Sequence, residues 1–365
     1  MKKLLALLLV LTMLFSVATL LSGCDDDGGK KASSSKKDDD DDEEEDTKED
    51  DPMESQDPTD PSEPTEPQGP TEYVFDDTDG GPLLYKVTDS DGDVIWLFGT
   101  IHVGRDDFYP LPEYVQEAYE QSDALAVEAD IVAFEGDMAA QTQMVMKMLY
   151  RDGTTISSHI SPELYSVAKN ILSENGQYSY ALDYYNIAMW YQSVSGVVAQ
   201  KAGGDVSLGI DRYFLNDAKS SGKTIVEVES VMFQYEMLAD FSEELQIFLL
   251  QQTVASYTFV DESKKELNDM MDLWQSGNEA DWAEYCAQQL EISEDAPYEN
   301  YVALMEEYNQ AMILDRNEGM TQYAVEALET GDELFICVGS AHVFGEDGMA
   351  DNLRELGYKV ELIRS

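Results

Sequence analysis

Two short segments with the same plan, near opposite ends of the chain, constrain the fold most. Each is a continuous apolar run that ends in a glycine, with a histidine three residues later: Gly99 precedes His102, and Gly339 precedes His342. The runs are rich in Ile, Val and Phe and show no polar alternation, which is typical of strands buried on both faces of a parallel sheet. The pair therefore predicts an α/β fold.

The glycines and histidines of these segments predict one shared site. Gly99 and Gly339 permit a sharp turn and a close backbone approach at the end of each strand. Each histidine then emerges at the carboxyl edge of the sheet, where open α/β sheets place their ligands. The chain has three histidines in all. Two of them, His102 and His342, are expected to converge on one metal or one substrate.

The first residues have the pattern of an exported lipoprotein. Lys2 and Lys3 precede an apolar stretch over residues 4–21, which ends in Leu21-Ser-Gly-Cys24. This pattern predicts a signal peptide over residues 1–23, cleavage before Cys24 and a lipid on its sulfur. The protein is then expected at the cell membrane, lipid-anchored on the extracytoplasmic face. An ordinary signal peptide or membrane anchor is the alternative.

Residues 24–77 are expected to form a disordered tether between the lipid and a folded domain over residues 78–365. The segment carries 23 acidic residues, five lysines and six of the eleven prolines, without apolar periodicity. The remaining domain keeps 52 acidic against 15 basic side chains, a net charge near −37. Such a charge argues against nucleic acid and anionic lipid as partners.

The domain shows further sheet and helix patterns. Residues 83–87 and 94–98 flank an Asp-Gly turn and predict a β-hairpin, while residues 124–128 and 224–228 predict further strands. Helical patterns dominate about residues 134–330. We therefore expect a central mixed, mostly parallel sheet with a large helical insertion between the two histidine strands.

Charged residues at three places in the sequence are candidates for the same site. Glu128 ends an apolar strand, where a carboxylate is costly to bury unless it is paired, bound to metal or at a cleft. Glu227 and Glu229 follow the next strand, and their position favours Glu229. Arg316 interrupts the apolar face of a long helix and could orient a carboxylate or stabilise an oxyanion. A surface ion pair is the alternative for Arg316.

Nucleophiles other than water fit the pattern less well. Ser340 lies inside the second motif but lacks the nucleophile-elbow pattern. Cys286 and Cys337 are predicted to be buried free thiols, one in a helix and one within an apolar strand.

With both motifs placed, the chain resembles the TraB/GumN family, in the superfamily that also holds the Tiki proteases. The matching residues are Leu97-Phe-Gly-Thr-Ile-His102-Val-Gly104, Leu111-Pro112, Glu128, Gly209-Ile-Asp211, Val228-Glu229-Ser230 with Gln234, Arg316-Asn317, and Val338-Gly-Ser-Ala-His342-Val-Phe-Gly345 with Gly348. They span residues 83–363. The resemblance implies an α/β core with a helical insertion and a site formed by the two histidines with an acidic residue. It also implies divalent-metal-dependent proteolysis, as in the Tiki-like members, or control of peptide pheromone signals.

These expectations combine into a metal-dependent hydrolase, most simply a peptidase. His102, His342 and Glu128 are the expected metal ligands, and Glu128, Glu229 and Arg316 the expected catalytic groups. Two imidazoles and one or two carboxylates suit Mn²⁺, Co²⁺ or Zn²⁺, and an incomplete ligand set would leave room for an activated water.

Two alternatives stay open. The protein could bind or sequester a peptide or small molecule in the same cleft without cleaving it. Alternatively, both motif histidines could be structural, each bonded to a backbone carbonyl. The pattern does not set the substrate, the identity of the metal or the oligomeric state.

Overall fold

The computed structural model describes residues 80–290 and 300–364. The predicted signal peptide and the whole predicted tether, Cys24 included, lie outside the described residues. Within the described part of the chain, no helix is both long and apolar enough to cross a membrane.

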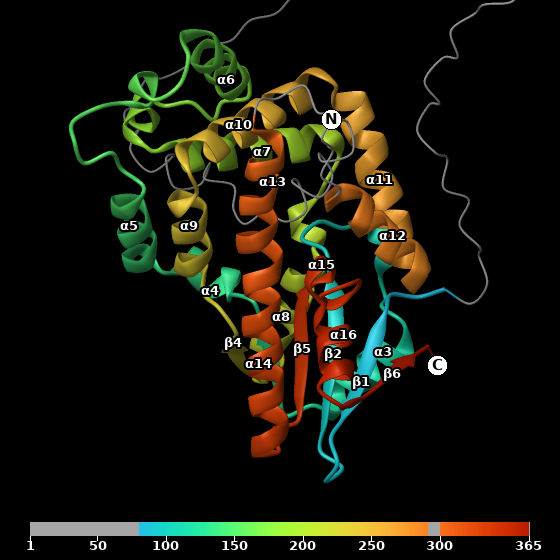
Figure 1. The fold of residues 1–365 in the computed structure, drawn as a ribbon. Helices are drawn as coiled ribbons and strands as arrows, with labels where there is room; N and C mark the ends of the chain where they lie inside the picture. Colours follow the sequence, from blue (N-terminus) through green and yellow to red (C-terminus); the bar gives the residue numbers. More distant parts are fainter. Residues whose placement is uncertain (1–79, 291–299, 365) are drawn as a thin grey trace, which may run out of the picture. The chain divides into compact units, whose positions relative to one another are not determined.

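A six-stranded sheet in the order β4-β3-β5-β2-β1-β6 forms the core of the fold (Figure 1). Strands β4, β3, β5 and β2 run parallel to one another, whereas β1 pairs antiparallel with both β2 and β6. The strands are β1 (Leu84–Thr88), β2 (Val94–Thr100), β3 (Ala124–Val127), β4 (Thr224–Glu227), β5 (Leu334–Gly339) and β6 (Lys359–Ile363). The predicted mixed, mostly parallel sheet is confirmed.

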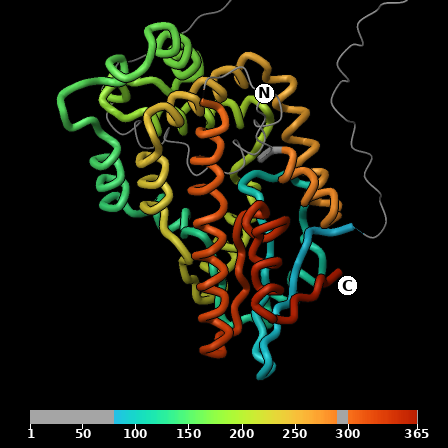
Figure 2. Tube along the Cα trace, viewed as in Figure 1, coloured from blue at the N-terminus to red at the C-terminus, as the bar shows by residue number. Residues whose placement is uncertain are grey.

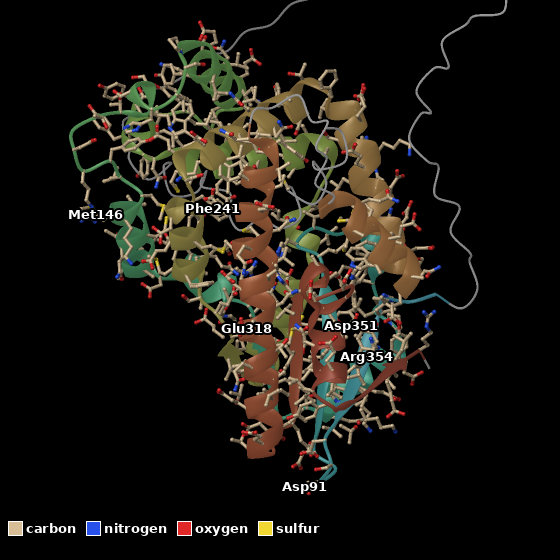
Figure 3. The ribbon with its side chains drawn as sticks, viewed as in Figure 1. Asp91, Met146, Phe241, Glu318, Asp351 and Arg354 are labelled. Atoms are coloured by element: carbon tan, nitrogen blue, oxygen red, sulfur yellow. The ribbon has the colours of Figure 1, made fainter. Side chains whose placement is uncertain are left out.

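The predicted hairpin is formed by β1 and β2. Its turn is closed by Asp89, whose Oδ1 accepts hydrogen bonds from the backbone N–H groups of Asp91, Gly92 and Asp93 at 2.8–2.9 Å. Asp91 lies at the exposed tip of the turn (Figure 3). The side-chain carboxylate thus accepts hydrogen bonds from three backbone N–H groups of the turn.

Helices fill most of the chain between the two motif strands, so the predicted insertion is also confirmed. The helices of the described chain are α3 (Glu113–Gln121), α4 (Ile131–Gly136), α5 (Met138–Lys147), α6 (Pro162–Glu174), α7 (Ile187–Ala202), α8 (Ile210–Ser221), α9 (Val231–Asp240), α10 (Glu243–Thr258), α11 (Val260–Ser276), α12 (Glu279–Leu290), α13 (Tyr301–Asn309), α14 (Asp315–Thr330), α15 (Ser340–Val343) and α16 (Met349–Glu355). Short 3₁₀ turns occupy Asp106–Phe108, Ile156–Ser158, Tyr180–Tyr184 and Val206–Leu208.

The helix ends follow local capping rules. Ser161 accepts a hydrogen bond from the backbone of Leu164 at the start of α6, and Pro162 stands at the first helical position. At the other ends of α7 and α8, Gly203 and Gly222 adopt the left-handed conformation that glycine tolerates best.

Two helices that carry site residues lie on opposite faces of the sheet. In Figure 1, α14 and α16 lie in front of the strands and α8 lies behind them with α3. The rings of Tyr119 on α3 and Phe214 on α8 are 4.9 Å apart, and both pack on Phe335 of β5.

A single helical run connects the helical insertion to the sheet. Figure 2 shows α13, the π-helical segment Gln310–Leu314 and α14 following one another along one continuous path. The apolar core has two clusters, one around the sheet and one within the insertion. Ala341 of the second motif packs against the insertion cluster, whereas Val343 belongs to the sheet cluster. The second motif therefore lies where the two clusters meet.

Candidate functional site

His102 follows β2 and is held by an aspartate from a distant helix. Its Nδ1 lies 2.8 Å from Oδ2 of Asp211, and the hydroxyl of Thr100 donates to the other oxygen of Asp211 at 2.5 Å. Burial disfavours the charged imidazole, but the adjacent Asp211 carboxylate outweighs burial and raises the pKa of His102 to about 9. A carboxylate oxygen accepts hydrogen bonds, so both the hydroxyl of Thr100 and Nδ1 of His102 donate to Asp211.

Close backbone contact places Asp211 beside His102. A Cβ at Gly209 would lie 2.5 Å from the carbonyl oxygen of His102, and one at Gly104 would overlap the carbonyl of Leu208. The N–H of Ile210 also donates to the carbonyl of Ile101 at 3.0 Å. The two loops can approach this closely only because both positions are glycine. Helix α8 therefore starts at the histidine loop, with Asp211 in its first turn.

Glu128 and Glu229 lie together around one arginine. The guanidinium of Arg316 donates to Glu128 at 2.7 Å and to both oxygens of Glu229 at 2.8 Å. The amide of Gln234 donates to each carboxylate at 3.0 Å. The side chains of Arg316, Glu128 and Glu229 are 3%, 8% and 9% exposed, so the surface ion pair considered for Arg316 is wrong.

The arginine keeps Glu128 available as an anion. Burial alone would raise the pKa of Glu128, but the charge of Arg316 lowers it to about 2. Burial opposes the charge of Arg316 in turn, and the two carboxylates raise its pKa above the ordinary value. Glu227, the competing candidate, is exposed and accepts a hydrogen bond from the backbone of Asp130 instead.

His342, in α15, is fully buried and is held by a neutral partner. Its Nδ1 lies 2.7 Å from Oδ1 of Asn317, and the amide nitrogen of Asn317 donates to the carbonyl of Asp347 at 2.8 Å. Nε2 of His342 is buried and has no hydrogen-bond partner among the residues that the structure describes. Burial and the charge of Arg316 lower the pKa of His342 to about 3, so this ring is neutral.

The predicted residues converge at the carboxyl edge of the parallel strands. Thr100 of β2 pairs with Gly339 of β5, so the two motifs leave adjacent strands side by side. Glu128, at the end of neighbouring β3, accepts a hydrogen bond from the N–H of Gly339 at 2.6 Å. The charge of Glu128 helps to raise the pKa of His102 and partly offsets the fall in the pKa of His342. The acid therefore lies within electrostatic reach of both rings.

The motif glycines contribute space in addition to the predicted turn. A Cβ at Gly339 would lie 3.1 Å from Oε1 of Glu128, and one at Gly99 would overlap the ring of Phe344. The φ of Gly339 is −53°, and Gly99 is not among the described glycines with positive φ. A larger residue would therefore be excluded by its side chain and not by its backbone conformation.

The donor set fits a divalent cation in part. Both imidazoles use Nδ1 toward an oxygen acceptor, the arrangement that orients metal-binding histidines through their other nitrogen. An ion could bind both rings only if His102 gave up the proton that its pKa of about 9 retains at neutral pH. Three carboxylates (Glu128, Glu229, Asp211) and one guanidinium would then leave two net negative charges, which one divalent ion would balance. Over residues 80–290 and 300–364, however, no three His, Cys, Asp or Glu side chains are already grouped as a metal site. Glu128 is bonded to Arg316, Gln234 and Gly339, so it could join the imidazoles only by exchanging one of these contacts.

Three residues of the site were not assigned by sequence reasoning, namely Asp211, Gln234 and Asn317. All three stand in the segments that carry the family resemblance, which was the one signal that could have indicated them. The thiol of Cys337 is fully buried, and burial raises its pKa well above the ordinary value, which agrees with the expected inert cysteine.

Comparison with known proteins gives a consistent result. The TraB/PrgY/gumN family matches residues 83–362, which include every site residue described above. Two relatives, both called Uncharacterized protein YbaP, come from Escherichia coli (strain K12) and Shigella flexneri. Each is 24% identical over 263 residues, which cover 71% of this chain and 87% of the relative. No solved structure matches the chain at a significant level. Since the match spans all but the last residue of the described sheet and both histidine motifs, the chain belongs to the TraB/PrgY/gumN family.

Proposed function

We propose that the protein is a metal-dependent hydrolase of peptides, anchored at the membrane surface by a lipid on Cys24. One observation carries the proposal: both motif histidines are held through Nδ1, and Nε2 of His342 is buried without any partner. A buried polar atom without a partner is costly in a native structure and calls for an ion, a water or a ligand. Mn²⁺, Co²⁺ and Zn²⁺ remain the proposed ions, since imidazole with carboxylate suits all three.

The residues of the chain have separable roles in this proposal. Nε2 of His102 and of His342 would hold the ion, which would polarise the scissile carbonyl as a Lewis acid. Glu128 lies between the two motifs and would be the third ligand if it exchanged a contact with Arg316. Arg316 would stay bonded to Glu229 and keep a positive charge near the reacting carbonyl.

Peptide cleavage in the presence of each ion tests this function. The purified chain is incubated with a peptide library and Mn²⁺, Co²⁺ or Zn²⁺, with and without chelator. We expect cleavage that chelator abolishes and that His102→Gln and His342→Gln each reduce by more than about 100-fold, because each removes a ligand. His159→Gln is the matched control. That ring stacks on Tyr150 and bonds Thr154, away from both motifs.

Cleavage that persists in chelator, or in both motif variants, would show that the reaction does not depend on these histidines and an ion. The same digestion separates hydrolysis from the non-catalytic alternative, which predicts no cleavage with any ion.

A non-catalytic peptide-binding role is the second candidate. It is favoured by the buried group of Arg316, Glu128 and Glu229, here called the ion triad. Glu128 and Glu229 both accept hydrogen bonds from Arg316, so neither carboxylate is free to act as a base in the structure as described. A binding protein would retain a peptide in chelator and release it intact. Equilibrium binding of peptides from the same library, followed by mass analysis of the recovered peptide, distinguishes the two roles.

The membrane anchor is tested independently of the site. Cys24→Ala removes the proposed lipid attachment and should move the protein from the membrane fraction to the soluble fraction. Catalytic or binding behaviour of the released protein should be unchanged, because Cys24 precedes the folded domain. Continued membrane retention of the variant would contradict lipidation at this residue.

A further inference from the structure

The amide of Asn317 has an orientation that its neighbours determine. Its nitrogen donates to the backbone carbonyl of Asp347 at 2.8 Å, and Asn352 donates to the same carbonyl at 3.1 Å. A backbone carbonyl can only accept. If the amide of Asn317 were turned over, its oxygen would face that carbonyl, and two acceptors would oppose each other. The amide oxygen therefore faces His342.

This orientation determines which nitrogen of His342 carries the proton. Oδ1 of Asn317 lies 2.7 Å from Nδ1 of His342 and can only accept, so Nδ1 carries the hydrogen. A neutral imidazole has one N–H and one bare nitrogen. Nε2 is then a lone pair, and it is the atom that is buried without a partner. The free imidazole ring favours the opposite tautomer, with the proton on Nε2, so the protein reverses an intrinsic preference.

We propose that Asn317 is a positioning residue that holds His342 in the Nδ1–H tautomer and thereby keeps Nε2 bare. The hydrogen bonds run from the carbonyl of Asp347, through the amide of Asn317, to the ring of His342. The tautomer assignment rests on the hydrogen bonds alone. The use of the bare nitrogen as a metal ligand rests on the proposed function.

The helix that carries Asn317 serves both halves of the site. Arg316 and Asn317 are consecutive buried residues near the start of α14. Neighbouring helix positions point about 100° apart, so one side chain reaches the carboxylates and the other reaches His342. The π-helical segment directly precedes them, and such segments are frequent at functional sites. The start of α14 thus supplies both the arginine that bonds Glu128 and Glu229 and the asparagine that bonds His342.

Nitrogen NMR of the unmodified, metal-free protein tests the tautomer directly. The three histidines, labelled with ¹⁵N, are assigned by the single variants His102→Gln, His159→Gln and His342→Gln. We expect His342 to show a protonated Nδ1 and an unprotonated Nε2 at neutral pH. A protonated Nε2 on His342 in the wild-type protein would overturn the proposal, whatever any variant does.

A pair of variants tests whether Asn317 is the cause. Asn317→Leu removes the acceptor at similar volume, and we expect His342 to move toward the Nε2–H tautomer. Asn352→Leu is the matched control, because Asn352 bonds the same carbonyl of Asp347 but has no hydrogen bond to His342. We expect the control to keep the wild-type tautomer. If both variants, or neither, changed the tautomer, Asn317 would not be the positioning residue.

Binding of Zn²⁺ alone separates this proposal from the proposed function. Asn317→Leu should weaken Zn²⁺ binding by about 10–100-fold, the usual effect of removing the partner of a metal-bound histidine. A switched tautomer with unchanged Zn²⁺ affinity would support the role of Asn317 and contradict His342 as a ligand. An unswitched tautomer would contradict the role of Asn317, even if Zn²⁺ binding were normal.

Discussion

At the scale of single residues, the partner of each motif histidine sets the character of its ring. His102 bonds the carboxylate of Asp211 and has a pKa of about 9, whereas His342 bonds the amide of Asn317 and has a pKa of about 3. The two rings occupy equivalent places in matching motifs, yet one is charged at neutral pH and the other is not. In the absence of an ion, the proton on His102 supplies part of the positive charge that the site requires.

The difference between the rings predicts the effect of Asp211→Asn. Without the carboxylate, burial and the charge of Arg316 lower the pKa of His102 and only the charge of Glu128 opposes them, so the pKa should fall well below 9. An NMR titration of the histidine rings measures this shift, with His159 as an internal reference. A His102 pKa that stays near 9 in the variant would show that Asp211 is not the cause of the elevation.

The ion triad predicts a pH-dependent contribution to stability. The pKa of Glu128 is lowered from 4.5 to about 2 in the folded protein, so its contribution is complete above pH 4.5 and is lost as the pH falls toward 2. A shift of this size corresponds to about 3 kcal/mol in the free energy of unfolding. Glu128→Gln should therefore be less stable than the wild type at pH 7, with a difference that shrinks toward pH 3.

Denaturant unfolding of both proteins across this range measures the difference. Comparison with the variant is required because the chain has many other acids that also titrate there. A wild-type advantage that did not change with pH would contradict the ionised state of Glu128.

Residue patterns predicted the parts of the site that follow strands. His102, His342, Glu128 and Glu229 each come directly after an apolar run, and parallel strands bring such positions to one edge. Asp211 and Asn317 come from helices instead. Apolar periodicity tells which face of a helix is buried but not which strand end its first turn approaches, so their partners could not be derived from the sequence.

At the scale of elements, the packing around the first motif strand leaves no room for a side chain at Gly99. Gly99→Ala would place a methyl group against the buried ring of Phe344 and 2.8 Å from the hydroxyl of Ser340. We expect this overpacking to lower the free energy of unfolding by about 1–3 kcal/mol. Gly319→Ala is the control, because Gly319 is exposed in α14 with no atom near its Cβ position.

The control should instead raise the free energy of unfolding by about 0.5–1 kcal/mol, as alanine favours a helix over glycine. Thermal or denaturant unfolding of the two variants checks both signs. Equal effects would show that the space beside Gly99 is not the reason for glycine in the first motif.

Strand and helix assignments differ in how far the sequence determines them. The hairpin of β1 and β2 was expected within two residues of its observed bounds, because turn chemistry marks it locally. The packing of the insertion was not expected. Helix α10, for example, buries the polar side chains of Gln246, Gln252 and Thr253 among its apolar ones, so its sequence does not mark one apolar face from which to infer its neighbours.

At the scale of the whole molecule, the strongly acidic composition suits a cation-binding site. The described chain buries its acids in only a few places, and the largest concentration of buried charge is the group formed by Glu128, Glu229 and Arg316. Elsewhere charged side chains such as Glu318 and Asp351 lie on the surface (Figure 3). Surface acids attract cations at long range but bind them weakly. In the proposed function, selective binding would therefore depend on the two motif imidazoles.

The stoichiometry of Co²⁺ binding to the purified chain tests this central claim most directly. Isothermal titration should give one ion per chain at the site for the wild type and for His159→Gln. His102→Gln and His342→Gln should each weaken that binding by more than about 100-fold, since each removes one imidazole ligand. Wild-type binding in both motif variants would contradict the claim that the two histidine strands form a single metal site.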